Sequence, residues 1–241
     1  MPPIRVRRAA VVPADALVPL LDPRERERLD RAAPGDRHAV ASALLLARLA
    51  VAEACAVAPD AVRVRRRCSR CGSAAHGVPV ADRADGGPVP HLSLSRGGDL
   101  VVVALSDAGP VGVDVEPVLP TPAPAGRDHP GADLARVVLA PGEPPAAGAH
   151  GPLRTWARTE AVLKAAGTGL AVDPRTLRVS DTTGHPDVRV LDRAAAAVVA
   201  GPGTRWWLTD LDVGGGHVAA LAALVPSGAS PVVDDRAVRL A

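Results

Sequence analysis

Residues 156–170 read WARTEAVLKAAGTGL and contain Lys164, the only lysine of the 241-residue chain. The stretch predicts a helix that ends at Gly167, because glycine readily adopts the left-handed conformation that closes a helix. Glu160 and Lys164 are four residues apart, so they are neighbours on one helix face. The alternative to a functional lysine is a simple surface pair with Glu160. Arginine would serve such a pair equally well, and the other 27 basic residues are all arginine. A compact ammonium group suits contact with a phosphate.

Residues 111–116, VGVDVE, alternate in the manner of a strand. Asp114 and Glu116 are expected to project from one face while the two valines face the core. Two carboxylates on one face, with Gly112 leaving space beside them, suit a hard cation such as Mg²⁺. The alternative is a strand that exposes its polar face to water.

The remaining sequence predicts helices and strands in a mixed α/β (α+β) fold. Helices are predicted from Asp22-Pro23 onward, over 39–57 and over 132–140. Strands are predicted at 9–13, 61–68, 91–118 with a turn at Gly97-Gly98, 175–180, 186–192 and 205–224. The length suits one large domain or two small lobes. A weak echo between 97–101 and 215–219 leaves two alternatives open: one helix-plus-hairpin plan used twice, or no internal duplication.

The net charge of +2 does not indicate a nucleic-acid binder, although residues 1–70 carry 14 arginines and 8 acidic residues. That local excess points to a phosphate-bearing ligand or an acidic partner, or to an arginine-rich solvated surface. No membrane span is predicted, because the apolar stretch 39–58 is interrupted by Arg48 and Glu53 and is typical of a buried helix. No signal peptide is expected at the N-terminus.

The segment RRRCSRCGSAAHGVP (65–79) contains Cys68, Cys71 and His76 at partial zinc-ligand spacing, without a second pair of ligands. The favoured interpretation is a loop in which Gly72 and Gly77 let the backbone approach a ligand. Three cysteines, two of them in a Cys-x-x-Cys motif, indicate a reducing cytoplasm.

A fourth motif is SLSRGG (93–98), a turn that offers hydroxyl groups, Arg96 and backbone N–H groups. Such a turn is suited to binding an anion. Taken alone, an ordinary hairpin turn is the simpler interpretation.

Together these motifs resemble one family, the Sfp-type 4′-phosphopantetheinyl transferases. Residues 112–116, GVDVE, resemble its G-(V/I)-D-(V/I)-E motif, and residues 156–164, WARTEAVLK, resemble W-(S/T)-x-K-E-A-x-x-K. The resemblance includes the Cys-x-x-Cys-Gly and His-Gly-x-Pro segment and the serine-rich turn. It runs from about Leu20 to Leu224.

The resemblance implies two similar lobes, each a small sheet packed with a long helix, related by a pseudo-twofold axis. Residues 1–117 would form the lobe that binds the nucleotide of coenzyme A, and residues 118–241 the lobe with the metal and the catalytic helix. The implied Mg²⁺ ligands are Asp114, Glu116 and Glu160. The implied catalytic residues are Asp114, Glu160 as the base, and Lys164. The implied coenzyme A-binding residues are Arg67, His76, Gly77, Ser95, Arg96 and Lys164.

The activity implied by the resemblance is transfer of 4′-phosphopantetheine from coenzyme A to a serine of an apo acyl, peptidyl or polyketide carrier protein, with release of 3′,5′-ADP. A cytoplasmic monomer of secondary metabolite biosynthesis, without nucleic acid or membrane partners, is expected. Three positions depart from the family pattern: Thr159 replaces a lysine, Arg96 a histidine and Val78 a lysine. These departures keep open a catalytically weakened module that binds coenzyme A or docks carriers. A zinc-stabilised nucleic-acid module is a third alternative.

Overall fold

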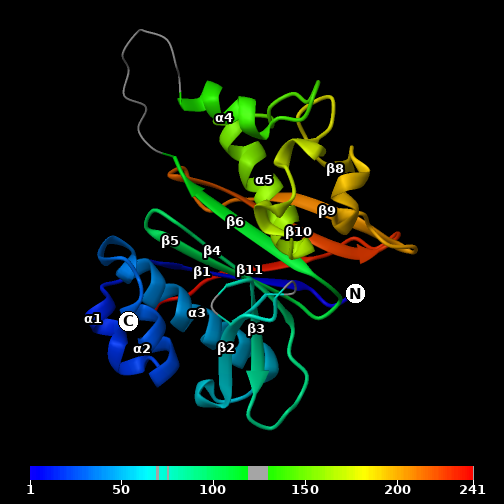
Figure 1. Ribbon diagram of the computed structural model, residues 1–241. Coiled ribbons are helices and arrows are strands. Elements are labelled where there is room, and N and C mark those ends of the chain that lie inside the picture. Colours follow the sequence, from blue (N-terminus) through cyan, green and yellow to red (C-terminus); the bar gives the residue numbers. More distant parts are fainter. Residues whose placement is uncertain (69–70, 75, 119–129, 241) are drawn as a thin grey trace. The chain divides into compact units, whose positions relative to one another are not determined.

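The computed structural model describes residues 1–68, 71–74, 76–118 and 130–240. Contacts divide the chain into two units, with Met1–Pro110 and Pro231–Ala241 in unit 1 and Val111–Ser230 in unit 2. Each unit combines helices with small sheets (Figure 1). The predicted mixed α/β class is therefore confirmed, while the pseudo-twofold relation stays a prediction.

The main sheet of unit 1 has the strand order β11-β1-β5-β4. Its strands are β1 (Ile4–Ala10), β4 (His91–Gly97), β5 (Leu100–Ser106) and β11 (Val233–Ala237). Neighbouring strands are antiparallel except β1 and β11, which run parallel. The predicted turn between β4 and β5 is present, and Gly98 has a φ of +57° there. Strand β1 begins five residues before the predicted 9–13 segment, and β11 was not predicted.

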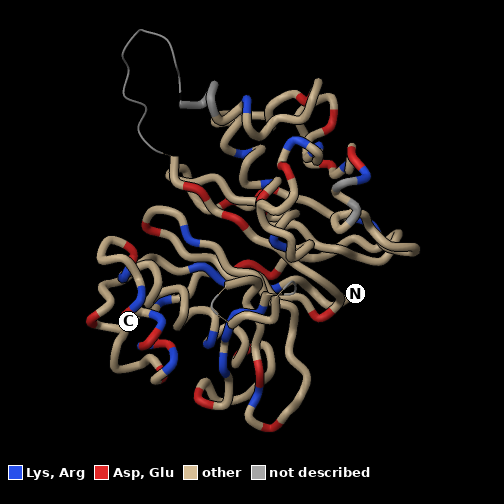
Figure 2. The backbone as a smooth tube through the Cα atoms, viewed as in Figure 1, with Lys and Arg blue, Asp and Glu red and all other residues tan. Residues whose placement is uncertain are grey.

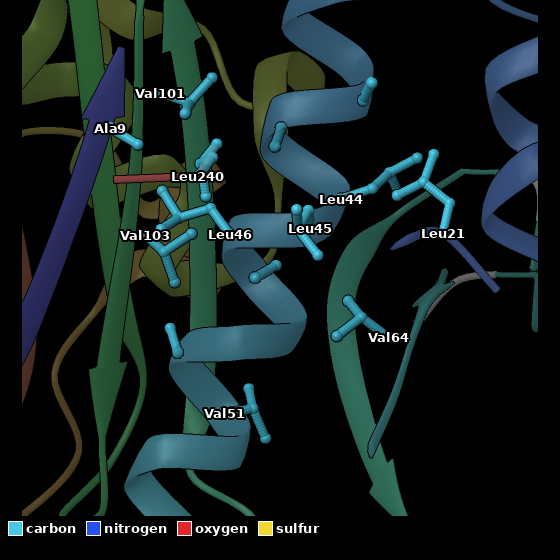
Figure 3. Close-up of a cluster of buried hydrophobic side chains, with 14 of the residues drawn as sticks. Ala9, Leu21, Leu44, Leu45, Leu46, Val51, Val64, Val101, Val103 and Leu240 are labelled. Carbon is cyan, nitrogen blue, oxygen red and sulfur yellow. The ribbon is translucent and has the colours of Figure 1, made fainter. Parts of the chain in front are cut away.

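The long helix of unit 1 is α3 (Arg37–Cys55), close to the predicted 39–57. It packs against β5, and Leu46, Val101 and Val103 meet in the core (Figure 3). Residues 34–55 are apolar and long enough to cross a membrane, but most of this stretch is buried in unit 1. The core position of α3 accounts for its apolar sequence.

Two shorter helices, α1 (Ala14–Leu17) and α2 (Pro23–Asp30), pack beside α3. Helix α2 begins where it was predicted, at the Asp22-Pro23 pair. The Asp22 carboxylate accepts a hydrogen bond from the Glu25 N–H, and the Glu25 carboxylate accepts one from the Asp22 N–H. This reciprocal cap satisfies two N–H groups that the helix itself cannot satisfy.

A separate hairpin of unit 1 consists of β2 (Val62–Arg67) and β3 (Val78–Arg83), which are antiparallel. The connecting loop carries the two cysteines and the histidine of the predicted partial zinc motif. Strand β2 alternates, with Val62 and Val64 buried and Arg63 and Arg65 exposed. Arg66 therefore lies on the valine face of the strand.

Unit 2 has a three-stranded antiparallel sheet with the order β6-β10-β9. Its strands are β6 (Val111–Pro117), β9 (Thr204–Leu211) and β10 (His217–Pro226), and a second sheet pairs β7 (Leu177–Ser180) with β8 (Pro186–Val190). The helices are α4 (Pro130–Val138) and α5 (Gly151–Ala166). Helix α5 packs across β6 and β10, and Gly167 ends it with a φ of +71°, as predicted.

The two units differ from the predicted lobes 1–117 and 118–241 at both ends. Strand β6 belongs to unit 2 because it pairs with β10 and packs against α5. Strand β11 belongs to unit 1 because it pairs with β1. The functions assigned to the two lobes stay predictions.

Candidate functional site

The candidate site of unit 2 begins where β6 meets helix α5. A Cβ atom at Gly112 would lie 1.9 Å from the carbonyl oxygen of Ala161, so only glycine lets strand and helix come this close. Gly112 thus makes room for the helix and does not leave space for a cation, which corrects its predicted role. The close approach fixes the side chains of α5 against those of β6.

Asp114 and Glu116 lie on the face of β6 that α5 covers. Asp114 pairs with Ala220 of β10, and Ala220 belongs to the core cluster that includes Ala161 of α5. Val113 and Val115 are buried, as predicted. Asp114 is only 3% exposed, so the alternative of a polar face turned to water is wrong.

Three residues of α5 at four-residue intervals meet the two acids of β6. Four helical residues rise about 6 Å and two strand residues span about 6.6 Å, so the two rows match in spacing. The Trp156 indole N–H donates to Glu116 Oε1 over 2.8 Å. Lys164 Nζ lies 2.6 Å from Asp114 Oδ1 and 3.2 Å from the Val113 carbonyl oxygen.

Glu160 lies on the same helical row, one turn from each of these two residues. The structure therefore groups the three predicted metal ligands and Lys164, which we call the acid cluster: Asp114, Glu116, Glu160 and Lys164. Lys164 contacts Asp114 and so is more than a surface partner of Glu160.

The acid cluster holds like charges in a partly buried place. Burial is the main cause that raises the pKa of Glu160 above its usual 4.5, and the nearby Asp114 charge raises it further. The pKa of Glu116 is raised first by burial and then by Asp114, while the Trp156 hydrogen bond acts in the opposite direction. Three carboxylates share one ammonium group, so the cluster is suited to a cation.

A buried carboxylate oxygen of the acid cluster needs a hydrogen-bond partner or a cation. Among the described residues, Glu160 Oε1 is buried and has no hydrogen-bond partner. A buried carboxylate oxygen without a partner is costly. A hard cation would satisfy it, because carboxylate oxygens are the ligands that Mg²⁺ prefers.

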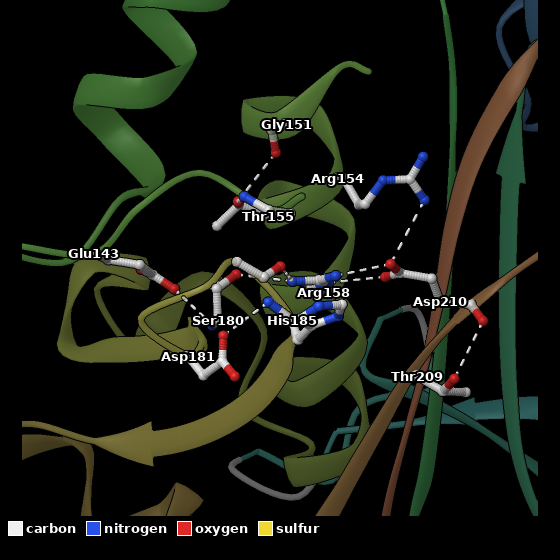
Figure 4. Close-up of polar contacts among 12 residues, drawn as sticks. Glu143, Gly151, Arg154, Thr155, Arg158, Ser180, Asp181, His185, Thr209 and Asp210 are labelled. Atoms are coloured by element: carbon white, nitrogen blue, oxygen red, sulfur yellow. Dashed lines mark hydrogen bonds and ion pairs between the residues drawn. The ribbon is translucent and has the colours of Figure 1, made fainter. Parts of the chain in front are cut away.

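The opposite side of α5 is anchored by a buried arginine (Figure 4). Arg158 is 1% exposed and forms two hydrogen bonds to the Asp210 carboxylate of β9, 2.8 and 2.7 Å long. Arg158 also donates to the Ser180 hydroxyl and the Gly184 carbonyl. Because residues 158 and 160 point about 200° apart around the helix, this network fixes α5 while Glu160 remains at the β6 edge.

Thr159, where the resembling family has lysine, lies inside this scaffold. It is fully buried, and its hydroxyl donates to the Thr155 carbonyl oxygen over 3.0 Å. The side chain is therefore satisfied by its own helix and adds no charge to the acid cluster.

A second candidate site lies in unit 1, in a cavity of about 260 Å³. We call it the arginine pocket. Its polar lining consists of Arg28, Arg31, Arg66, Ser95 and Arg96. Figure 2 marks basic residues along α2 and β2, two of the elements that form it.

The arginines of this pocket repel one another. The pKa of Arg66 is lowered by burial and then by the Arg96 charge, and the pKa of Arg28 is lowered by burial and then by the Arg66 charge. Within the described chain, neither Arg28 nor Arg66 forms an ion pair. Such a pocket is suited to a phosphate group, which accepts several charge-assisted hydrogen bonds.

The predicted coenzyme A-binding residues do not all lie at this pocket. Ser95 and Arg96 line it, whereas Arg67 is exposed on the other face of β2. His76 lies beside Cys71, and the Gly77 carbonyl accepts a hydrogen bond from Arg66 over 2.7 Å.

Sequence reasoning missed Arg28, Arg31, Arg66 and Trp156. Arg28 and Arg31 are three residues apart on and just after α2, so they share one helix face. The alternation of β2 distinguishes Arg66 from Arg67. These spacings are visible in the sequence, but they do not show that the three arginines line one pocket.

One comparison with known proteins matches the part of the chain that contains the acid cluster. The model of the 4′-phosphopantetheinyl transferase superfamily matches residues 110–221, which include β6 and α5. The match supports the superfamily and phosphopantetheine transfer in general for this part of the chain. The arginine pocket lies outside the matched residues. No match was found among curated proteins.

Proposed function

We propose that the protein is an Sfp-type enzyme that transfers 4′-phosphopantetheine from coenzyme A to a serine of an apo carrier protein and releases 3′,5′-ADP. The observation that supports this most strongly is the acid cluster, in which a lysine and three carboxylates meet within the superfamily match. A phosphoanhydride reaction needs both a cation and a positioned base, and the cluster offers groups for each.

The acid cluster fits Mg²⁺, which Asp114, Glu116 and Glu160 would hold. The donor set is entirely oxygen, and Glu160 Oε1 lacks a partner among the described residues. Bound Mg²⁺ would neutralise charge on the pyrophosphate of coenzyme A. In the described chain the three carboxylates do not form a group with all ligand atoms within 4.8 Å of one another, so their side chains would have to move closer together to hold the ion.

Glu160 is the proposed general base for the serine hydroxyl. Without a metal, burial raises the pKa of Glu160, and bound Mg²⁺ would lower it again. The proposal that Glu160 is the base therefore rests on its position in the acid cluster beside Asp114 and Lys164. The Arg158–Asp210 network fixes the helix that carries Glu160. The Arg158–Asp210 network thus positions the proposed base, although it lies on the other side of α5.

Lys164 has two proposed roles. Its ammonium group orients Asp114 across a 2.6 Å contact. Its side chain is 27% exposed, so it also reaches solvent, where a phosphate oxygen could contact it. A point charge on a flexible stem serves both partners.

The arginine pocket is the proposed site for the 3′-phosphate of coenzyme A. Its arginines offer forked N–H donors that match phosphate oxygens. Arg66 replaces the predicted Arg67 in this proposal because it lines the pocket. The cytoplasmic location and the monomeric state stay predictions.

Transfer to carrier proteins tests the proposed function directly. A panel of apo acyl, peptidyl and polyketide carrier proteins is incubated with coenzyme A and Mg²⁺, and intact masses and released 3′,5′-ADP are measured. We expect one phosphopantetheine and one 3′,5′-ADP per modified carrier, and no reaction with excess EDTA. Binding of coenzyme A without modification of any carrier would instead support the non-catalytic module.

A further inference from the structure

Three metal-binding side chains lie together in the loop that joins β2 to β3. They are Cys68, Cys71 and His76, and one ligand atom from each lies within 4.8 Å of the other two. Cys71 Sγ and His76 Nε2 are 3.3 Å apart. Within the described part of the chain, this is the one group of at least three histidine, cysteine or acidic side chains that is gathered so closely.

The 3.3 Å separation of Cys71 Sγ and His76 Nε2 is close to the edge of a zinc tetrahedron. Zinc binds sulfur at about 2.3 Å and imidazole nitrogen at about 2.0–2.1 Å. In a regular tetrahedron a sulfur and a nitrogen ligand are then about 3.6 Å apart, and two sulfur ligands about 3.8 Å apart. A side-chain shift of about 0.3 Å brings the Cys71–His76 pair from 3.3 Å to the sulfur–nitrogen value.

The loop backbone supports the same arrangement. The Gly72 N–H donates to the Cys68 carbonyl, and the Cys68 N–H donates to the Ser73 carbonyl, both over 2.9 Å. Gly72 has a φ of +72°, which glycine adopts without strain. The turn folds back on Cys68 and so brings the side chain of Cys71 beside it.

The far end of the loop is equally constrained. Gly77 directly follows His76 and has a φ of +98°, and a Cβ atom there would lie 2.3 Å from the Arg67 carbonyl oxygen. The backbone therefore returns tightly against the end of β2. This return places His76 beside Cys71, although His76 lies five positions further along the chain.

We infer that Cys68, Cys71 and His76 form a zinc-binding site. Two thiolates and one imidazole are soft and borderline donors that favour zinc over Mg²⁺. The three protein ligands leave one coordination position for water or for another donor. His76 is then a metal ligand and not one of the coenzyme A-binding residues.

Bound zinc would stabilise the loop whose Gly77 carbonyl accepts the Arg66 hydrogen bond. Arg66 lines the arginine pocket, so the zinc site would act on that pocket by holding Arg66 in place. This consequence rests on the proposed function, whereas the zinc site itself does not.

Zinc content tests the inference without any use of coenzyme A. The full chain is purified under reducing conditions without chelators, and zinc per chain is measured by inductively coupled plasma mass spectrometry. We expect about one zinc per wild-type chain, and at least a tenfold lower content in Cys71→Ser and in His76→Ala. Zinc-free protein loaded with Co²⁺ should show a sulfur-to-cobalt charge-transfer absorption, which the same two substitutions remove.

Two further variants serve as controls. Cys55→Ser removes a cysteine that lies at the end of α3, outside the cluster, and should keep the zinc. His76→Cys keeps three ligands of suitable chemistry and should also keep it, so a comparison with His76→Ala separates lost ligation from lost folding.

Two results would overturn the zinc site. One is wild-type protein that holds no zinc and takes up none after reduction and dialysis against Zn²⁺. The other is full zinc content in Cys71→Ser and His76→Ala. Because neither readout involves carrier modification, failure of the transferase proposal would leave this result unaffected.

Discussion

The acid cluster of unit 2 and the arginine pocket of unit 1 both hold like charges together, but they are assembled differently. The acid cluster takes its residues from one strand and one helix at regular intervals. The arginine pocket takes its residues from α2 and the position after it, from β2 and from β4. Each arrangement carries an electrostatic cost that a ligand of opposite charge relieves. The two sites therefore call for a cation and an anion, respectively.

The two sites also differ in burial. The side chain of Asp114 is 5% exposed, whereas that of Arg96 is 42% exposed. Changes in a buried, fixed cluster disturb the positions of reacting groups, which affects the rate most. Changes in the arginine pocket, in which Arg96 is exposed and Arg66 is half-buried, remove a contact to bound phosphate, which affects affinity most.

The largest effect is expected for Glu160→Gln. Loss of the proposed base should lower kcat about 100-fold or more. The melting temperature should hold or rise, because burial disfavours the ionised form of Glu160. Steady-state carrier modification and thermal unfolding measure the two quantities.

Glu143→Gln is the matched control for that variant. Glu143 is also buried in unit 2, but its carboxylate accepts hydrogen bonds from three backbone N–H groups, those of Ala140, Val179 and Ser180. We expect a lower melting temperature with little change in the kcat of folded protein. A smaller loss of kcat in Glu160→Gln than in Glu143→Gln would remove Glu160 from the proposed chemistry.

The next effect concerns Lys164→Arg. A planar guanidinium is wider than the ammonium group that contacts Asp114, so it should displace both the carboxylate and a bound phosphate. We expect kcat to fall about tenfold, which corresponds to about 1.4 kcal/mol of barrier. Arg154→Lys, an exchange on the same helix, should be nearly silent. Wild-type turnover in Lys164→Arg would show that Lys164 is only an ion-pair partner that arginine can replace.

A similar or smaller effect, confined to affinity, is expected for Arg66→Ala. Loss of one charge-assisted hydrogen bond should raise the KM for coenzyme A about tenfold. The KM for 3′-dephospho-coenzyme A should change little. Arg67→Ala, next along β2 but on its other face, provides the control and should leave both values near wild type. Equal losses for the two substrates in Arg66→Ala would show that Arg66 does not bind the 3′-phosphate.

The smallest effect concerns pH. The pKa values of Glu116 and Glu160 are raised in the folded protein, so their contribution to stability is full below about pH 4.5 and is lost as the pH rises through the raised values. In EDTA, the melting temperature of Glu160→Gln relative to wild type should therefore increase from pH 5 to pH 7. Added Mg²⁺ should reduce that difference. A difference that shrinks with rising pH would contradict the assigned pKa direction.

The acid cluster could be predicted from the sequence because the patterns that indicate it lie within one strand and one helix. Strand and helix periodicities place Asp114 with Glu116 and Glu160 with Lys164, and the family resemblance joins the two pairs. The contact between Lys164 and Asp114 depends on how closely α5 packs on β6. That packing is set by Gly112, for which the sequence suggested a different role.

The arginine pocket was only half predicted because its members come from separate elements. Ser95 and Arg96 belonged to a recognisable turn, while Arg28 and Arg31 lay on a helix predicted only as a helix. In a chain with 27 arginines, residue type distinguishes none of them. The pairing of β11 with β1 was missed for a related reason, since parallel pairing of distant segments has no local signal.

The central claim is that the acid cluster carries out the transfer and does not merely bind coenzyme A. Carrier modification at saturating coenzyme A and Mg²⁺, compared between wild type and Asp114→Asn, tests it most directly. The account predicts that wild type modifies the carrier and that the variant does so at least about 100-fold more slowly. The affinity for coenzyme A, measured by calorimetry, should stay within a few-fold of wild type. Modification of the carrier by Asp114→Asn at the wild-type rate would contradict it.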